Sequence, residues 1–130
     1  MRSVRAAVLL AALAAGCSRP SPEVVRRQRL LARIDTLPRL EAEQRAWPRG
    51  ATLACDERAA ERGGEIDVLR AELVELTASL GVQQALGPLF EACDELKECA
   101  RCDEGFAARC SRTRELLVDV QLALARAGLR

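Results

Sequence analysis

The sequence predicts an all-α protein, a small antiparallel helical bundle that is stapled by disulfide bonds. Three observations support this prediction. Apolar residues recur at helical spacing in several stretches, no stretch shows a strand signal, and glycine or proline residues separate the helical stretches by short connections. Short connections make neighbouring helices antiparallel. Aromatic residues are scarce, so leucine, valine and alanine must fill the core.

The first helix of the domain is expected to begin at Pro22. Apolar residues follow it at helical spacing, namely Val24, Leu30, Leu31, Ile34 and Leu37. Pro38 should end or kink this helix, or begin the next one with Thr36 as its cap. The helical stretch continues to Trp47, and residues 48–50 form a turn.

The clearest signal in the chain is an apolar seam after a weaker helical stretch. Residues 51–62 look weakly helical and should stop at Gly63 and Gly64. The seam then has spacings of three and four residues and consists of Ile66, Leu69, Leu73, Leu76 and Leu80. Burial is its expected role, because a small domain needs every apolar stripe it has. Contact with a partner helix is the alternative.

Two more helices complete the predicted bundle. After a break at Gly87 and Pro88, residues 89–101 resume helical spacing. Residues 103–105 are expected to turn the chain. The last helix should run to Ala127 and stop at Gly128, with an apolar face that consists of Leu117, Val120, Leu124 and Ala127.

The composition excludes several classes of function. The net charge of the 130-residue chain is +1, which argues against nucleic acid as a partner. The sequence contains no histidine, so neither a Ser-His or Cys-His nucleophile nor a histidine-assisted metal site can be built. We therefore expect a non-enzymatic protein without a cofactor or a metal site.

The N-terminus has the layout of a bacterial signal peptide. A basic segment at residues 1–5 precedes an uncharged apolar run at residues 6–15, which is too short to span a bilayer. The sequence Leu13-Ala-Ala-Gly16-Cys17 and a Ser/Pro-rich stretch follow. These residues resemble the lipobox of bacterial lipoprotein precursors, although Ala14 stands where that family most often has leucine. An ordinary secretory signal and a buried N-terminal helix are the alternatives.

The resemblance implies a membrane-anchored protein. Cleavage would fall between Gly16 and Cys17, and the Cys17 sulfur would carry a diacylglyceryl group. The expected organisation is a signal peptide at residues 1–16, a lipidated cysteine with an extended tether at 17–22, and one helical domain at 23–130. The domain would face the periplasm, and Ser18 after the cysteine favours the outer membrane by the sorting habit of the family.

The predicted first helix is basic and lies next to the anchor. Its arginines are Arg26, Arg27, Arg29 and Arg33. They could rest on anionic lipid headgroups. The favoured alternative is a solvated helix face that pairs with the acidic middle of the chain, because residues 55–104 carry five basic and thirteen acidic side chains.

With Cys17 assigned to the lipid, the remaining cysteines are disulfide candidates: Cys55, Cys93, Cys99, Cys102 and Cys110. An oxidising compartment favours disulfides, and an odd number leaves one thiol unpaired. Cys99 and Cys102 form half of a zinc site, but the matching half is missing. A thioredoxin-like reading of this pair lacks the strand–helix unit that it requires.

The spacing suggests a connectivity. Cys99 and Cys110 lie about equally far from Gly105, so an antiparallel turn there brings them opposite each other. Such a bridge stabilises by about 3 kcal/mol in the chain-entropy model. Cys55 would then pair with Cys93 or Cys102 and tie the earlier segment to this hairpin.

Two functions compete at this point. The first is a lipid-anchored cell-envelope protein that acts as a structural or protein-interaction module, with a partner or a second copy bound through the unpaired cysteine or the seam at residues 66–80. The second is an envelope thiol-redox or metal-binding protein that uses the Cys93–Cys110 cluster. The sequence does not identify the partner or the pathway.

Overall fold

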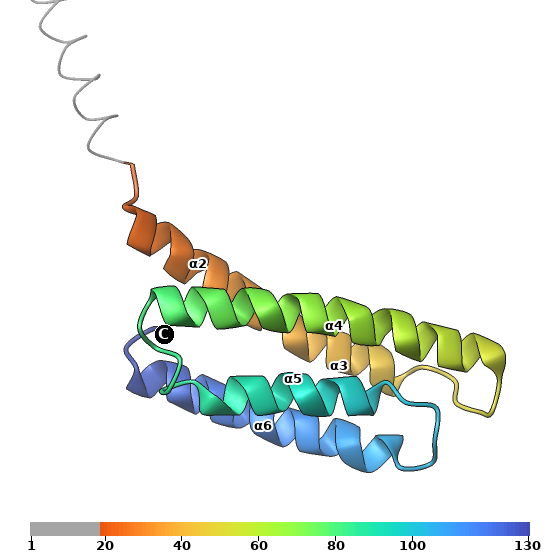
Figure 1. The fold of residues 1–130 in the computed structure, drawn as a ribbon. Coiled ribbons are helices and arrows are strands. Elements are labelled where there is room, and N and C mark those ends of the chain that lie inside the picture. Colours follow the sequence, from red (N-terminus) through yellow and green to blue (C-terminus); the bar gives the residue numbers. More distant parts are fainter. Residues whose placement is uncertain (1–18) are drawn as a thin grey trace, which may run out of the picture.

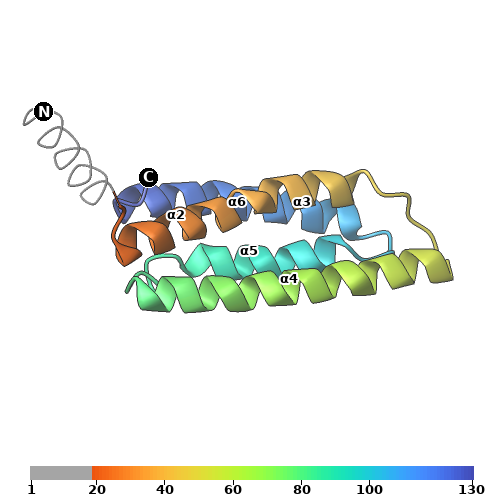
Figure 2. The same cartoon turned by 90° about the horizontal axis from the view of Figure 1, so that it is seen from above.

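The computed structural model describes residues 19–130, and within them every regular element is an α-helix. The helices are α2 (Pro22–Ile34), α3 (Thr36–Arg45), α4 (Leu53–Ser79), α5 (Gly87–Cys99) and α6 (Phe106–Arg126). They lie side by side as an elongated bundle, with α2 and α3 end to end along one side (Figures 1 and 2). The predicted all-α class is confirmed. The predicted signal peptide at 1–16 and the predicted lipid site Cys17 lie outside the described residues.

The joint between α2 and α3 is a single residue, Asp35. The Ser21 hydroxyl caps α2 by accepting from the Val24 N–H at 3.2 Å, and the helix begins at Pro22 as predicted. Pro22 therefore belongs to the helix and not to the tether, which was expected to span 17–22. The Thr36 hydroxyl donates to the Arg33 carbonyl at 2.6 Å, at the end of α2, and Thr36 is not a cap. Pro38 lies in the first turn of α3, where its missing N–H costs no hydrogen bond.

The predicted stop at Gly63 and Gly64 is wrong, because α4 runs unbroken through both glycines. The Thr52 hydroxyl caps this helix by accepting from the Cys55 N–H at 3.1 Å. Gly63 is buried, and a Cβ there would lie 3.2 Å from the Lys97 side chain of α5. Lys97 continues past this glycine to an ion pair with Asp67, at 3.0 Å. Gly63 thus allows a lysine stem to cross α4, and packing overrides the low helix propensity of glycine.

Gly64→Ala should raise the free energy of unfolding by about 0.5–1 kcal/mol, because the site is a helix interior and a Cβ there meets nothing within 4 Å. Urea unfolding followed by circular dichroism measures the change. Gly63→Ala is the matched control and should gain less, since Lys97 must shift. An equal gain at both positions would contradict the packing role of Gly63.

The core runs along the centre of the bundle and receives side chains from every helix. Its fully buried large members are Leu30, Ile34, Leu37, Ile66, Leu73, Leu86, Leu89, Leu96, Val120 and Leu124. The predicted seam of α4 belongs to this core, with Leu69 and Leu80 at its edge. Most of the seam is therefore buried inside the domain, which is the role that the sequence favoured for it.

The hairpin of α5 and α6 forms as the sequence predicts, with one difference. The Asp103 carboxylate accepts from the Gly105 N–H at 3.0 Å and holds the turn between the two helices. Gly128 and Gly81 adopt positive φ angles of 70° and 69° just after α6 and α4, as helix-terminating glycines do. However, α5 ends at Cys99, two residues before the expected end at residue 101, and Cys102 lies in the turn that follows.

The basic first helix is partly neutralised by α4. Glu72 accepts from Arg29 at 2.8 Å and from Arg33 at 3.1 Å. Arg27 donates instead to the Gly128 carbonyl at the C-terminal end of α6. The basic face of α2 thus pairs with groups of the same chain, as expected if it is a solvated helix face and does not rest on lipid headgroups. Each exposed ion pair contributes less than about 1 kcal/mol to stability.

A buried carboxylate joins α3 to α6. The Glu41 side chain is 2% exposed and accepts from Arg114 of α6 at 2.8 Å and from Arg45 of its own helix at 3.4 Å. Burial of an ionised carboxylate requires such partners. Arg114 therefore links α6 to α3, and Arg45 is a second partner of the carboxylate from its own helix.

Candidate functional site

Four of the five cysteines outside the predicted lipid site gather at one end of the bundle. This end, which we call the cysteine end, contains the α3–α4 and α5–α6 connections and lies opposite the start of α2 (Figures 1 and 2). Two disulfides close it, Cys55–Cys102 and Cys99–Cys110. The prediction that disulfides staple the helical domain is thereby confirmed.

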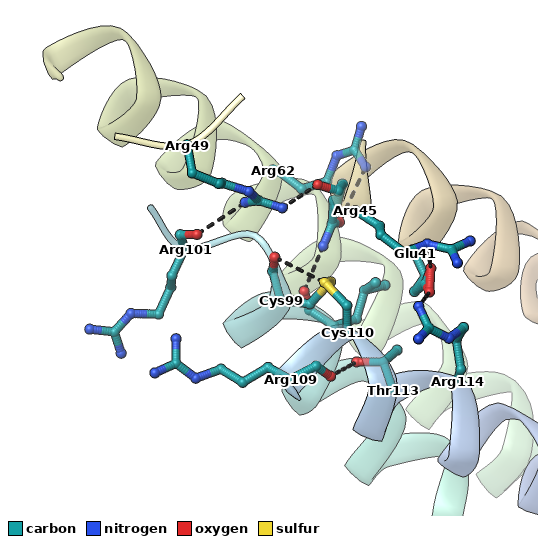
Figure 3. The surroundings of a disulfide bond; sticks show 12 residues. Glu41, Arg45, Arg49, Arg62, Cys99, Arg101, Arg109, Cys110, Thr113 and Arg114 are labelled. Atoms are coloured by element: carbon teal, nitrogen blue, oxygen red, sulfur yellow. Dashed lines mark hydrogen bonds and ion pairs between the residues drawn. A yellow bond between two sulfur atoms is a disulfide. The ribbon is translucent and has the colours of Figure 1, made fainter. Parts of the chain in front are cut away.

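The Cys99–Cys110 bond joins the last residue of α5 to the second turn of α6, with 4.7 Å between the Cα atoms. Both residues are fully buried. This is the pairing expected from their similar distance to Gly105. Figure 3 shows the bridge surrounded by arginine side chains from several helices.

The Cys55–Cys102 bond connects the first turn of α4 to the α5–α6 turn, 47 residues along the chain. Of the two partners that the sequence left open for Cys55, the structure selects Cys102, with 6.1 Å between the Cα atoms. Cys102 is partly exposed, whereas Cys55 is buried. The bridge is therefore the one at the cysteine end that solvent can reach.

The remaining thiol of the described residues belongs to Cys93, which lies on α5 and is buried in the core of the bundle. Burial raises the pKa of the Cys93 thiol to about 12. A thiol that is both enclosed and protonated is a poor nucleophile. The unpaired cysteine thus has no exposed surface through which it could join two copies of the folded domain.

Cys99 and Cys102, which form half of a zinc site in the sequence, belong to two different disulfides: Cys99 is bonded to Cys110 and Cys102 to Cys55. Within residues 19–130, no three cysteine, aspartate or glutamate side chains come together as a possible metal site. Cys99 and Cys102 are also not bonded to each other, as a thioredoxin-like centre would require in its oxidised form.

Arginines surround the single tryptophan beside these bridges. The Arg58 and Arg62 guanidinium carbons lie 4.5 and 4.8 Å from the centre of the Trp47 ring, and that of Arg49 lies 4.1 Å from the centre of Phe106. Such geometry is a cation–π contact. Burial and the neighbouring Arg58 lower the pKa of Arg49. The spacing of Arg58 and Arg62 indicates one helix face, but nothing in the sequence places Trp47 against it.

Two of these arginines, Arg49 and Arg58, donate hydrogen bonds to backbone carbonyls. Arg49 donates to the Arg101 carbonyl at 3.0 Å and to the Gln44 carbonyl, and Arg58 donates to the Pro48 carbonyl at 2.7 Å (Figure 3 draws the bonds of Arg49). The Gln44 amide in turn donates to the Leu96 carbonyl at 2.7 Å. Arg49 therefore links the α3–α4 connection to the segment just after α5, and Arg58 links it to α4.

A surface cavity of about 480 Å³ opens at the cysteine end. Its lining includes Arg49, Phe106 and the partly exposed Cys102. The acidic side chains of Asp103 and Glu104 lie at the same opening. The cavity thus borders Cys102, the partly exposed residue of the Cys55–Cys102 bond.

Comparisons with protein-family models, with curated proteins and with solved structures found no match to this chain. Among the helices of residues 19–130, none combines the length and the hydropathy of a membrane span.

Proposed function

We propose that this chain is a lipid-anchored bacterial cell-envelope protein whose helical domain acts as a non-enzymatic structural or protein-interaction module. The anchor is a diacylglyceryl group on Cys17, and the domain faces the periplasm, most simply from the outer membrane. The observation that carries this proposal is the sequence Leu13-Ala-Ala-Gly16-Cys17, placed between a short apolar run and a Ser/Pro-rich tether.

The domain that follows the tether supports the same location. Its helices begin at Pro22, five positions after Cys17, so the anchor and the folded domain are adjacent in the chain. Two disulfides staple the domain. Disulfides persist in the periplasm and are rare in the reducing cytosol, so they suit a protein that is exported.

A role in binding is supported by apolar side chains on the outside of the bundle. Val118 and Leu122 of α6 are 61% and 51% exposed, and they lie one turn apart on the same helix face. Val68 of α4 is 71% exposed. Isolated exposed apolar residues are common, but a pair on one face offers a contact for another protein.

The lipid on Cys17 is the first prediction to test. The full chain should be expressed in a bacterium with an alkyne analogue of palmitate, and the mature protein analysed by in-gel detection and peptide mass spectrometry. We expect the label on a new N-terminal peptide that begins at Cys17, because the lipidated cysteine becomes the first residue after cleavage. Stable anchoring requires at least two acyl chains.

Cys17→Ala should abolish the label and leave an uncleaved precursor. Cys93→Ala is the matched control, because it removes another unpaired cysteine and should leave labelling and cleavage unchanged. An unlabelled wild-type protein, or a label that persists in Cys17→Ala, would refute lipid anchoring at this residue.

A further inference from the structure

The two disulfides of the cysteine end differ in their surroundings. Both sulfur-bearing residues of Cys99–Cys110 are fully buried, whereas Cys102 of the other bridge is partly exposed and lines the cavity beside Arg49 and Phe106. Thiol–disulfide exchange requires a thiolate to reach one sulfur of the bond. Of these two bridges, only Cys55–Cys102 offers such access.

The buried sulfur of this bridge lies where a thiolate is stabilised. Cys55 is in the first turn of α4, whose N–H groups and helix dipole favour negative charge. The Arg58 guanidinium lies 3.9 Å from the Cys55 sulfur. Within the described residues, Arg58 forms no ion pair with a carboxylate that would compete for its charge. Nearby cations and helix N-termini are the features that make a cysteine thiolate a good leaving group.

Adjacent carboxylates do not distinguish the two sulfurs. Cys55 is followed by Asp56 and Glu57, and Cys102 is followed by Asp103 and Glu104. The difference lies in exposure and in Arg58. Cys102 is partly exposed and lines the cavity, whereas Cys55 is buried with the Arg58 guanidinium 3.9 Å from its sulfur. Attack on Cys102 and departure of Cys55 are therefore the favoured direction.

We propose that Cys55–Cys102 is a site of thiol–disulfide exchange, at which a dithiol reductant attacks Cys102 and releases Cys55. The attacking thiolate forms a new S–S bond to Cys102 while the bond from Cys102 to Cys55 breaks, and its electron pair leaves on the Cys55 sulfur beside Arg58. The second thiol of the reductant then attacks the sulfur bound to Cys102. Its own disulfide forms, and Cys102 leaves as a thiolate. The protein gains two electrons and the dithiol loses two.

The proposal is tested on the oxidised mature protein with dithiothreitol as the dithiol. Samples are quenched in acid at intervals, alkylated and mapped by mass spectrometry. We expect Cys55 and Cys102 to be alkylated at least about tenfold faster than Cys99 and Cys110, because only the first bridge is accessible. Cys93 should remain unmodified until the protein is unfolded. Equal rates for both bridges, or faster opening of Cys99–Cys110, would overturn the proposal.

Glutathione shows which sulfur is attacked, because it forms a mixed disulfide with that cysteine and an acid quench preserves the mixed disulfide for peptide mapping. We expect glutathione on Cys102. Glutathione mainly on Cys55 would overturn the assigned roles even if this bridge opens first.

Substitutions at Arg58 test the leaving group. Arg58→Gln should slow reduction of Cys55–Cys102 by about fivefold, and Arg58→Lys should restore most of the rate by restoring the cation. Arg62→Gln is the matched control: Arg62 also lies over Trp47, one turn further along α4, but it has no contact with the Cys55 sulfur. An equal effect of both glutamine substitutions would reject the role of Arg58. The reduction rates and the glutathione site are measured on the wild-type protein, so these two tests do not depend on whether a variant folds.

Discussion

Glu41→Ala should lower the free energy of unfolding by about 1.5–3 kcal/mol, because the change removes a buried carboxylate that accepts from two arginines, while Arg114 and Arg45 remain 43% and 51% exposed to water. Glu41 is 2% exposed, and its two oxygens accept from Arg114 and Arg45 at 2.8 and 3.4 Å. Chemical denaturation at neutral pH, followed by circular dichroism, measures the loss. The pair joins α3 to α6, so protection of α3 amides from hydrogen exchange should fall in the same variant.

Glu43→Ala provides the matched control. Glu43 lies on the same helix and also pairs with an arginine, Arg62 at 2.9 Å, but its side chain is 47% exposed. This pair should contribute less than about 1 kcal/mol, because Glu43 is half exposed and Arg62 keeps Glu65 as a partner at 3.2 Å when Glu43 is removed. A loss of about 1 kcal/mol or less in Glu41→Ala would show that the contacts of Glu41 with the two arginines are not a determinant of stability.

A double substitution separates the cost of an unpaired charge from the value of the pair. Glu41→Leu combined with Arg114→Met replaces both charged groups by apolar side chains of similar volume. Such replacements are often neutral or stabilising, because the desolvation cost of the charges disappears with them. We expect the double variant to recover most of the stability lost in Glu41→Ala.

The helical class could be predicted because the buried residues of a helix recur at regular spacing in the sequence. Leu30, Ile34 and Leu37 recur at helical spacing on one face, and all three are buried. The seam that contains Ile66 and Leu73 is buried for the same reason. Spacing of this kind reports which face of a helix meets the core, whatever the neighbouring helix is.

Features that depend on a distant contact could not be predicted in this way. Gly63 and Gly64 have low helix propensity, and only the position of Lys97 on α5 shows why α4 continues through them. Likewise, Glu41 resembles any surface acid in the sequence. Its burial depends on Arg114, 73 residues further along the chain. Local propensity is a weak signal where tertiary contacts oppose it.

The choice of partner for Cys55 depended on one helix boundary. A helix that included Cys102 would have placed this residue on α5, and Cys93 would have been as plausible a partner. Because α5 ends at Cys99, Cys102 lies in the turn and reaches the start of α4. Helix ends are the least certain part of a prediction from sequence, since fraying and the final turn shift them by one or two residues.

Removal of the buried bridge by Cys99→Ala and Cys110→Ala should lower the free energy of unfolding by about 3 kcal/mol, the value that chain entropy gives for a loop of this size. The bridge joins α5 and α6 where both sulfur-bearing residues are fully buried, so the folded hairpin has little freedom to relax when the bond is absent. Guanidinium unfolding of the double variant, compared with the oxidised wild-type protein, gives the value.

Cys55→Ala with Cys102→Ala is the discriminating comparison. Its loop of 47 residues is longer, and chain entropy alone would assign it about 4 kcal/mol. However, Cys55 and Gly63 are the only buried residues in the first three turns of α4, so this segment can fray when its bond is removed and the folded state regains entropy. We therefore expect a loss below 3 kcal/mol and fast amide exchange confined to residues 53–62. A larger loss than in the Cys99/Cys110 variant, without local exchange, would mean that the start of α4 is held by its packing against Trp47 and not by the bridge.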